Sequence, residues 1–260
     1  MTTFDISTFE SALTTRAIGR NFVYRRVIDT TMDLARDLAA KGAPHGTLVL
    51  AEHQTAGRGR RGRSFHSPDA ENLYFTLVFR TEPEVHRRLP VVLPVATCRV
   101  CAIEGVDARI KWPNDIWIGA RKLSGMLIDA EFVAESALAL GLAGIGINVN
   151  GDPTLVPELR DTATSLSREL RRSVQREPLL ARLCNEIEEQ LAASERELIE
   201  AYRGLSLVLG HQVVLSFPSG ETREATATGI EADGSLTVRY DDGSAEAVSA
   251  ADVSLRPAAS

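Results

Sequence analysis

A loop near position 60 concentrates the side chains that could do chemistry. Three glycines and four arginines fall within residues 57–63, directly after the apolar run 47–52. Glycine lets a ligand approach the backbone closely, and the planar guanidinium of arginine pairs with carboxylate or phosphate oxygens. The loop therefore predicts a site for an anionic ligand. Taken alone, these arginines also fit a solvated basic loop or an RNA-binding patch.

Two lysines and a polar turn form a second cluster. Lys111 opens the run Lys-Trp-Pro-Asn-Asp, and Lys122 follows eleven residues later. If the intervening turn folds the two segments antiparallel, both ammonium groups can reach one pocket. Each lysine by itself is more often a surface charge, so this prediction depends on the arginine loop lying nearby.

A third signal is a pair of glycines, Gly144 and Gly146, inside the apolar segment 137–149. Glycine within a strand indicates that something packs closely against the backbone, although a plain bulge would give the same pattern.

The cysteines favour structure over chemistry. Cys98 and Cys101 form a C-x-x-C within the apolar run 91–106, where positions three apart share one helix face. No strand precedes the motif as in redox proteins, and the chain has no second ligand pair for zinc. The pattern predicts a buried core, and the odd total of three cysteines fits a reducing compartment.

Hydrophobic periodicity predicts the elements that must position these residues. Short alternating strands and turns begin at residue 210, which predicts a catalytic domain over 1–206 and a small β domain over 207–260. The predicted helices are 34–40, 91–103 and one long helix over 178–202, and the predicted strands are 47–52, 72–79, 108–112, 116–118, 126–131 and 137–149.

Four motifs in this order resemble the catalytic domain of biotin protein ligases. The resemblance is strong over roughly residues 25–150 and weaker over the end of the chain, which resembles the SH3-like β-barrel of these enzymes. It implies an α+β fold of the class II synthetase-like kind, with a mixed, mainly antiparallel sheet and flanking helices. The motifs are Gln54-x-x-Gly57-Arg58-Gly59-Arg60-x-Gly62-Arg63, then Lys111-Trp112-Pro113-Asn114-Asp115, then Lys122-x-x-Gly125-x-Leu127, then Gly144-x-Gly146-x-Asn148.

The resemblance also implies a role for each matching position. Arg58, Lys111 and Lys122 would be catalytic, because cations must neutralise the charge where a carboxylate attacks a phosphate. The biotin site would comprise Thr30, Thr31, Gln54, Gly57, Arg58, Lys122, Gly125, Gly144 and Gly146. The nucleotide site would comprise Arg58, Gly59, Arg60, Arg63, Asn114, Asp115 and Asn148. Biotin and ATP would be the substrates, with Mg²⁺ on the phosphates and no metal ligands from the protein.

Three residues depart from the family's usual pattern. Met32 stands where the family usually has asparagine, Phe65 where tryptophan is common, and Asp129 where glutamate is usual. The hydroxyls of Thr30 and Thr31 preserve the first polar contacts, so we interpret the departures as tuning.

The expected partner is a biotin carboxyl carrier protein, whose lysine accepts biotin. A lipoate-type ligase or acyltransferase is the nearest alternative. The net charge of −6 gives no global reason to expect nucleic acid, and the segment before residue 25 is too short for an independent DNA-binding domain. No apolar run is long enough to span a membrane. We therefore expect a cytoplasmic monomer or weak homodimer that binds neither DNA nor membrane.

Overall fold

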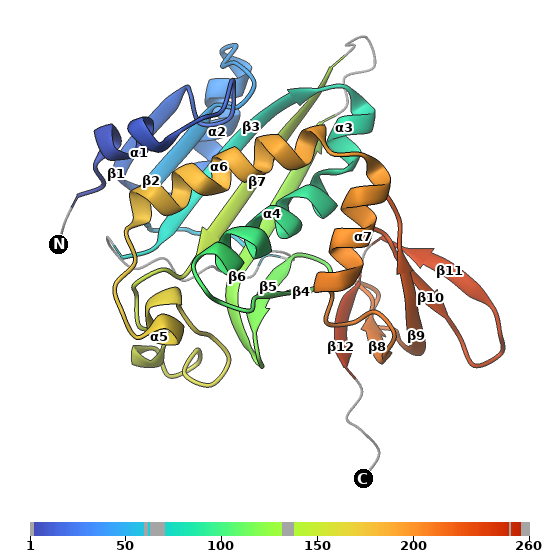
Figure 1. The fold of residues 1–260 in the computed structure, drawn as a ribbon. Coiled ribbons are helices and arrows are strands. Elements are labelled where there is room, and N and C mark those ends of the chain that lie inside the picture. The colour runs from blue at the N-terminus through green and yellow to red at the C-terminus, as the bar shows by residue number, and fades with distance from the viewer. Residues whose placement is uncertain (1–2, 60–61, 63–70, 132–137, 250, 256–260) are drawn as a thin grey trace.

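The computed structural model describes residues 3–59, 62, 71–131, 138–249 and 251–255, which form two sheets with helices (Figure 1). The larger sheet has seven strands in the order β1-β2-β3-β7-β6-β5-β4. Its strands are β1 (Phe22–Ile28), β2 (Leu48–Gln54), β3 (Leu73–Thr81), β4 (Arg109–Lys111), β5 (Asp115–Ile118), β6 (Arg121–Glu131) and β7 (Ala139–Ile147). Only β1 and β2 pair in parallel, which confirms the predicted mixed, mainly antiparallel sheet.

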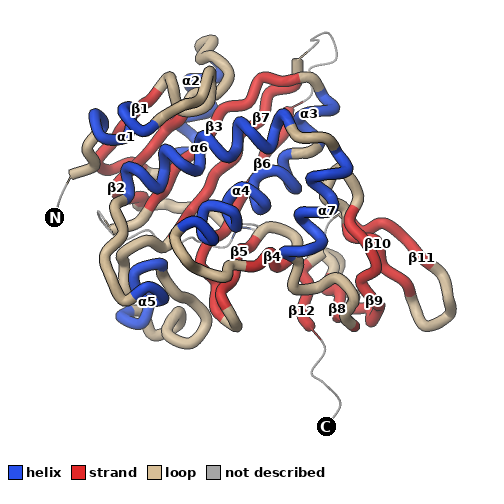
Figure 2. The backbone as a smooth tube through the Cα atoms, in the orientation of Figure 1, coloured by secondary structure: helices blue, strands red, loops and turns tan. Residues whose placement is uncertain are grey.

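The helices lie unequally on the two faces of this sheet (Figures 1 and 2). On one face α4 and α6 cross the strands, with α1 packed against α6 and α7 against α4. The other face is contacted by α2, over β2, β3 and β7. The helices are α1 (Ile6–Ala12), α2 (Thr31–Ala40), α3 (Pro83–Arg87), α4 (Leu89–Ile103), α5 (Leu166–Leu170), α6 (Arg176–Ala192) and α7 (Glu195–Leu205), with a 3₁₀ turn at Pro153–Leu155.

The alternation of side chains along β2 explains why helices must cover both faces of the larger sheet. Leu48 and Leu50 belong to the main core, whereas Val49 between them packs with Met32 and Ala35 of α2 in a smaller cluster. Because successive strand residues point to opposite faces, an almost continuous apolar run must be buried on both sides.

Helix α2 begins at Thr31, three residues before the predicted helix 34–40, whereas the composition of α4 agrees with the sequence. Thr30 is the N-cap of α2, and its side chain accepts a hydrogen bond from the Met32 amide. In α4 nearly every side chain is buried, including Cys98 and Cys101. Burial raises the pKa of Cys101 to about 12 and also raises the pKa of Cys98. Both thiols are free and packed in the core, as predicted.

The prediction of one long helix over 178–202 is wrong. The chain breaks into α6 and α7 at Ser194, whose hydroxyl accepts from the Glu197 amide while the Glu197 carboxylate accepts from the Ser194 amide. This capping box starts a new helix. The spacing Ser-x-x-Glu was visible in the sequence, but the uninterrupted apolar periodicity obscured it.

Residues 3–21, which precede β1, pack against the rest of the protein. Phe4 and Phe9 enter the main core, and α1 packs against α6. The carboxylate of Glu188 on α6 accepts hydrogen bonds from the backbone amides of Arg16, Ala17 and Ile18. These contacts bring the segment before β1 onto the helical layer.

The C-terminal residues form a five-stranded antiparallel sheet in the order β11-β10-β9-β8-β12. Within the described residues no ladder joins β11 to β12, so the expected barrel is an unclosed sheet here. Residues from both sheets share one hydrophobic core, and the boundary near residue 206 stays a prediction. The strands are β8 (Gln212–Ser216), β9 (Thr222–Ile230), β10 (Leu236–Arg239), β11 (Ala245–Val248) and β12 (Asp252–Leu255). None of the helices in the described ranges is both long and apolar enough to cross a bilayer.

A buried ion pair ties β2 to α6. Arg176 contacts the Glu52 carboxylate at 2.5 Å and also donates to the Asn72 carbonyl, while the Phe4 amide and the Tyr24 hydroxyl donate to Glu52. Burial by itself raises the pKa of Glu52, but the hydrogen bonds from Arg176 and Phe4 outweigh it and leave that pKa below its usual value. The cluster joins four separate segments through one carboxylate.

We predict that Glu52→Gln lowers the free energy of unfolding by about 3–5 kcal/mol at pH 7, because it leaves the Arg176 charge buried without its carboxylate. Urea denaturation measures this. The Glu52 pKa is lowered on folding, so its contribution is present above about pH 4.3, the unfolded value, and is lost as pH falls through the folded value. Glu200→Gln is the matched control, since the Arg196–Glu200 pair is exposed and should cost below about 1 kcal/mol. Equal losses in the two variants would contradict the prediction.

We also predict that Cys98, Cys101 and Cys184 do not react with DTNB in the native protein at pH 8. All three are buried, and burial raises the pKa of each, so almost no thiolate is present or accessible. All three should react in guanidinium chloride. Fast labelling of any thiol without denaturant would show that the packing of α4 or α6 is wrong.

Candidate active site

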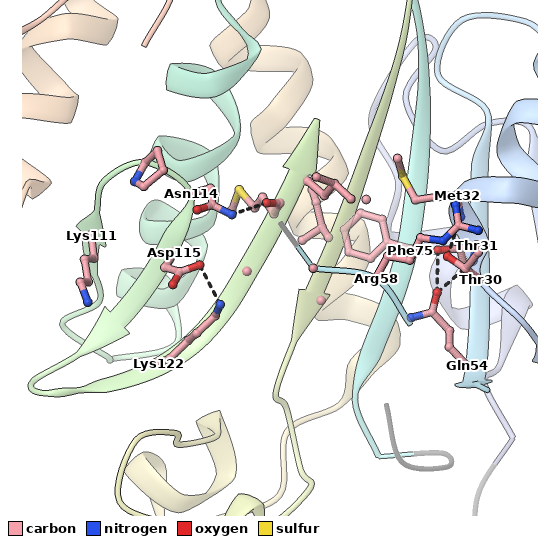
Figure 3. A pocket seen from close by; sticks show the side chains of 18 of the residues that line it. Thr30, Thr31, Met32, Gln54, Arg58, Phe75, Lys111, Asn114, Asp115 and Lys122 are labelled. Carbon is pink, nitrogen blue, oxygen red and sulfur yellow. Dashed lines mark hydrogen bonds and ion pairs between the residues drawn. The ribbon is translucent and has the colours of Figure 1, made fainter. Parts of the chain in front are cut away.

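A cavity of about 240 Å³ lies on the sheet face that carries α2, between the start of that helix and strands β4–β6 (Figure 3). Segments from the whole chain reach it, including the end of β2, the loop that follows, and β12 of the second sheet. Its lining comprises Thr30, Thr31, Met32, Gln54, Arg58, Gly59, Phe75, Lys111, Trp112, Pro113, Asn114, Asp115, Lys122, Gly125, Met126, Leu127, Gly144, Ile145, Gly146, Asp252 and Val253.

Three glycines on two neighbouring strands leave the sheet bare beneath the cavity. Gly125 of β6 pairs with Gly146 of β7, and Gly144 pairs with Leu127. A Cβ on Gly144 would lie 2.8 Å from the Met32 sulfur, and one on Gly125 would lie 2.9 Å from the Lys122 Nζ. The glycines therefore let the Met32 and Lys122 side chains pack closely against the backbone, which agrees with the close approach that the sequence predicted.

A chain of hydrogen bonds fixes the polar corner of the cavity at the start of α2. The Thr76 hydroxyl donates to Thr31 at 2.8 Å, and the Thr31 amide and hydroxyl both donate to Gln54 Oε1, at 2.9 and 3.1 Å. Thr30 and Thr31 are almost fully buried. Each group is held by its neighbour, so the corner presents a fixed set of polar atoms to a ligand.

The three cations of the cavity have different surroundings (Figure 3). Lys122 Nζ lies 2.8 Å from Asp115 Oδ1, inside the cavity. Arg58 donates two hydrogen bonds to the Asp33 carboxylate on α2, at 2.8 and 2.7 Å. Lys111 Nζ lies 3.9 Å from the centre of the Trp117 ring, a cation–π contact, and points away from Lys122. Arg58 and Lys122 are thus brought to opposite sides of one cavity.

The turn before β5 is held by reciprocal bonds to β6. The Asn114 side-chain amide donates to the Met126 carbonyl at 2.5 Å, and the Met126 amide donates to the Asn114 carbonyl at 3.0 Å. This pairing keeps Asp115 opposite Gly125, where its carboxylate meets Lys122. The prediction that the two lysine segments lie antiparallel is wrong, because β4 with Lys111 and β6 with Lys122 each pair antiparallel with β5 between them and therefore run parallel to each other.

Most residues assigned to the site from the sequence lie in the cavity wall, but their ligand contacts stay predictions. Gly57 is buried in the loop and does not line the cavity, and the Asn148 side chain donates to the Thr164 carbonyl instead. Arg60, Arg63 and Phe65 lie outside the described residues. The predicted residues that line the cavity are Thr30, Thr31, Gln54, Arg58, Gly59, Lys111, Asn114, Asp115, Lys122, Gly125, Gly144 and Gly146.

The sequence did not indicate the apolar and C-terminal parts of the wall. Phe75 and Ile145 come from ordinary-looking apolar strands, and nothing in the local pattern separates them from core residues. Asp252 and Val253 reach the cavity from β12. Of the departures from the family pattern, Met32 lines the cavity, and Asp129 pairs with Arg36 of α2 at 2.7 Å.

Comparison with protein-family models divides the chain in two. Residues 24–148 match the biotin/lipoate A/B protein ligase family, and residues 208–256 match the biotin protein ligase C-terminal domain. The cavity residues from Thr30 to Gly146 fall inside the first match, and Asp252 and Val253 fall inside the second. The fold and the site therefore define a ligase of the biotin and lipoate class.

Similarity to individual proteins narrows the class from biotin and lipoate ligases to biotin ligases. The chain is 29% identical over 262 residues to a biotin–[acetyl-CoA-carboxylase] ligase of Mycobacterium tuberculosis, with 94% of each chain covered. It is 39% identical over 160 residues to the bifunctional ligase/repressor BirA of Bacillus subtilis, where the match spans 60% of this chain and 49% of the relative. An Aquifex aeolicus biotin protein ligase in complex with biotin and ATP has a TM-score of 0.75 and 27% identity, covering 91% of this chain and 99% of its own. The chain belongs to the biotin protein ligase family.

We predict that Gly125→Ala weakens ligand binding at this cavity by about tenfold or more while leaving stability nearly unchanged. The new methyl group would lie 2.9 Å from Lys122 Nζ, the flexible end of a side chain, so the lysine moves off Asp115 and the fold does not need to adjust. Titration with biotin, the ligand named in the Aquifex complex, measures the change.

Gly204→Ala is the control, because an added Cβ there meets no atom within 4 Å. Biotin affinity equal to wild type in Gly125→Ala would show that the position of Lys122 does not matter for binding.

Proposed function

We propose that this protein activates biotin with ATP to biotinyl-5′-AMP and then transfers biotin to a lysine of a biotin carboxyl carrier protein. The observation that carries the proposal is that Arg58 and Lys122, from separate segments, line one cavity above a bare glycine floor. The relatives of known name support it. The match to the Bacillus BirA spans about half of that protein's length, so the activity of this chain is a proposal of ours and is not taken over from the relative.

The first half-reaction joins two anions, and the cations lower its barrier. A carboxylate oxygen of biotin attacks the α-phosphorus of ATP, a new O–P bond forms, and the bond to pyrophosphate breaks. Lys122 would neutralise the biotin carboxylate, while Arg58 would neutralise the phosphate across the cavity. Asp115 keeps the Lys122 ammonium in the cavity before the substrate arrives, and Lys111 lies on the same wall.

In the second half-reaction the ε-amine of a carrier lysine attacks the acyl carbon of the mixed anhydride, and AMP leaves. The amine must be neutral to attack, so it has to lose a proton on entry. Asp115, one of two aspartates that line the cavity with Asp252, would receive this proton. Arg58 and Gly59 line the cavity, and their side of the wall would help to keep water from the anhydride and so slow its hydrolysis.

We propose the following division between the two substrates of the residues assigned from the sequence, of which Gly57 and Asn148 do not line the cavity and Arg60 and Arg63 lie outside the described residues. Biotin would contact the threonine–glutamine corner and the glycine floor, comprising Thr30, Thr31, Gln54, Gly57, Arg58, Lys122, Gly125, Gly144 and Gly146. The nucleotide would contact the loop and the lysine turn, comprising Arg58, Gly59, Arg60, Arg63, Asn114, Asp115 and Asn148.

Mg²⁺ would enter with the nucleotide and be held mainly by its phosphates. Within the described ranges no three His, Cys, Asp or Glu side chains converge to form a metal cage, and Asp115 is already paired with Lys122. Mg²⁺ commonly keeps several waters and is held by phosphates with one or two carboxylates. It would supply further neutralisation of the phosphate charge.

Several finer statements belong to the proposal. Residues 1–206 would form the catalytic domain and 207–260 the C-terminal β domain. The three free thiols support a cytoplasmic location, since reducing compartments keep cysteines unpaired. A monomer or weak homodimer, and the lack of DNA and membrane partners, stay predictions.

We predict biotin-dependent ATP–pyrophosphate exchange by the wild-type protein, reduced about 10²–10³-fold in Arg58→Ala and in Lys122→Ala, the loss typical of one preorganised charge donor. Lys41→Ala is the matched control, because Lys41 is exposed at the end of α2 and outside the cavity. Wild-type rates in both site variants would remove these residues from the mechanism.

The same assay distinguishes a biotin ligase from the nearest alternative, a lipoate-type ligase. Lipoate in place of biotin should support no exchange, and a carrier protein should become labelled only with biotin. Exchange driven by lipoate alone would reassign the protein to the lipoate branch of the family model that residues 24–148 match.

A further inference from the structure

Strand β7 pairs with most of β6 but does not reach the first residues of β6. The β6–β7 ladder begins only at Ser124 and Ile147, so Lys122 lies beyond the end of β7. The segment 162–164 occupies the vacated position. The Lys122 amide donates to the Thr162 carbonyl at 2.8 Å, and the Thr164 amide donates to the Lys122 carbonyl at 2.9 Å. Both main-chain polar groups of Lys122 are therefore held by this segment.

Asn148 joins that segment to β6. Its side-chain amide donates to the Thr164 carbonyl at 3.0 Å, and its backbone amide donates to the Leu123 carbonyl at 3.0 Å. Its own carbonyl accepts from the Leu166 amide at 3.1 Å. One residue thus bonds β6 at Leu123, next to Lys122, and the C-terminal end of the segment that pairs with Lys122, at Thr164 and Leu166.

A second contact fixes the same segment from the other side. The Thr164 hydroxyl donates to the Glu169 carboxylate at 2.5 Å, and Arg121 pairs with that carboxylate at 2.9 Å. Arg121 precedes Lys122 directly in β6. The backbone around Lys122 is consequently held through Asn148 and through Glu169, and both routes pass through Thr164.

We propose that Asn148 is also a positioning residue for Lys122, acting through the Thr164 carbonyl. This inference rests on the proposed function and deepens it. A lysine side chain loses considerable conformational entropy when it is ordered, and a small displacement of a reacting group costs rate steeply. Fixing both main-chain polar groups of Lys122 on segment 162–164 reduces the volume that its ammonium can reach. The loss of the Asn148 side chain would loosen that segment.

Hydrogen exchange of the ligand-free protein tests directly whether Asn148 holds the backbone of Lys122. In Asn148→Ala, and in Asn148→Asp, which keeps the shape but loses the donor, the Lys122 and Thr164 amides should exchange at least tenfold faster. Asn150→Ala is the matched control. The Asn150 side chain also bridges to a neighbouring loop, donating to the Val174 carbonyl and accepting from the Val174 amide, both at 2.9 Å, without reaching Lys122. Unchanged exchange in both Asn148 variants overturns the proposal.

Binding measurements separate positioning from nucleotide contact. We expect Asn148→Ala to raise the dissociation constant for biotin at least tenfold without ATP, and to have little further effect when Lys122 is already alanine. A variant that raises only the KM for ATP, with wild-type biotin affinity, also overturns the proposal. If the wild-type protein binds no biotin, the proposed function fails, while the exchange experiment still decides whether Asn148 holds Lys122 in place.

Discussion

The candidate site depends on bringing positive charge from two distant segments to one cavity while the sheet between them stays bare. Gly125 and Gly146 pair across β6 and β7, and Gly144 lies two residues along, so these strands place no side chain of their own under the cavity. The Met32 side chain lies over Gly144 and the Lys122 side chain over Gly125, in space that a Cβ would take. The strand register, more than any single side chain, makes room for a ligand.

The charges are balanced before a ligand arrives. Lys122 contacts Asp115 and Arg58 contacts Asp33, so neither cation is left to water alone in the ligand-free protein. An incoming carboxylate or phosphate must exchange with an existing partner, which limits the net gain from each new contact. This arrangement favours ligands that reach both cations together, as the joined biotin and adenylate groups of the proposed intermediate would.

The second sheet takes part in the site. The Trp112 indole donates to the Gly234 carbonyl at 2.8 Å, the Leu207 amide donates to the Ile110 carbonyl, and Asp252 and Val253 of β12 line the cavity. The strand that begins the lysine turn is therefore supported by the C-terminal residues, and one hydrophobic core extends through both parts. The two matched family segments act as one structural unit around the cavity.

The sequence by itself determined the family, the sheet type and the residues that carry charge, because glycine spacing, arginine density and strand periodicity are local properties. It also indicated the buried role of Cys98 and Cys101. Only the tertiary structure decided that the segment 178–202 breaks at Ser194, that β12 reaches the cavity, and that Lys111 rests on Trp117 while Lys122 faces Asp115. Those outcomes depend on register and on long-range contacts, which a pattern read along one chain does not contain.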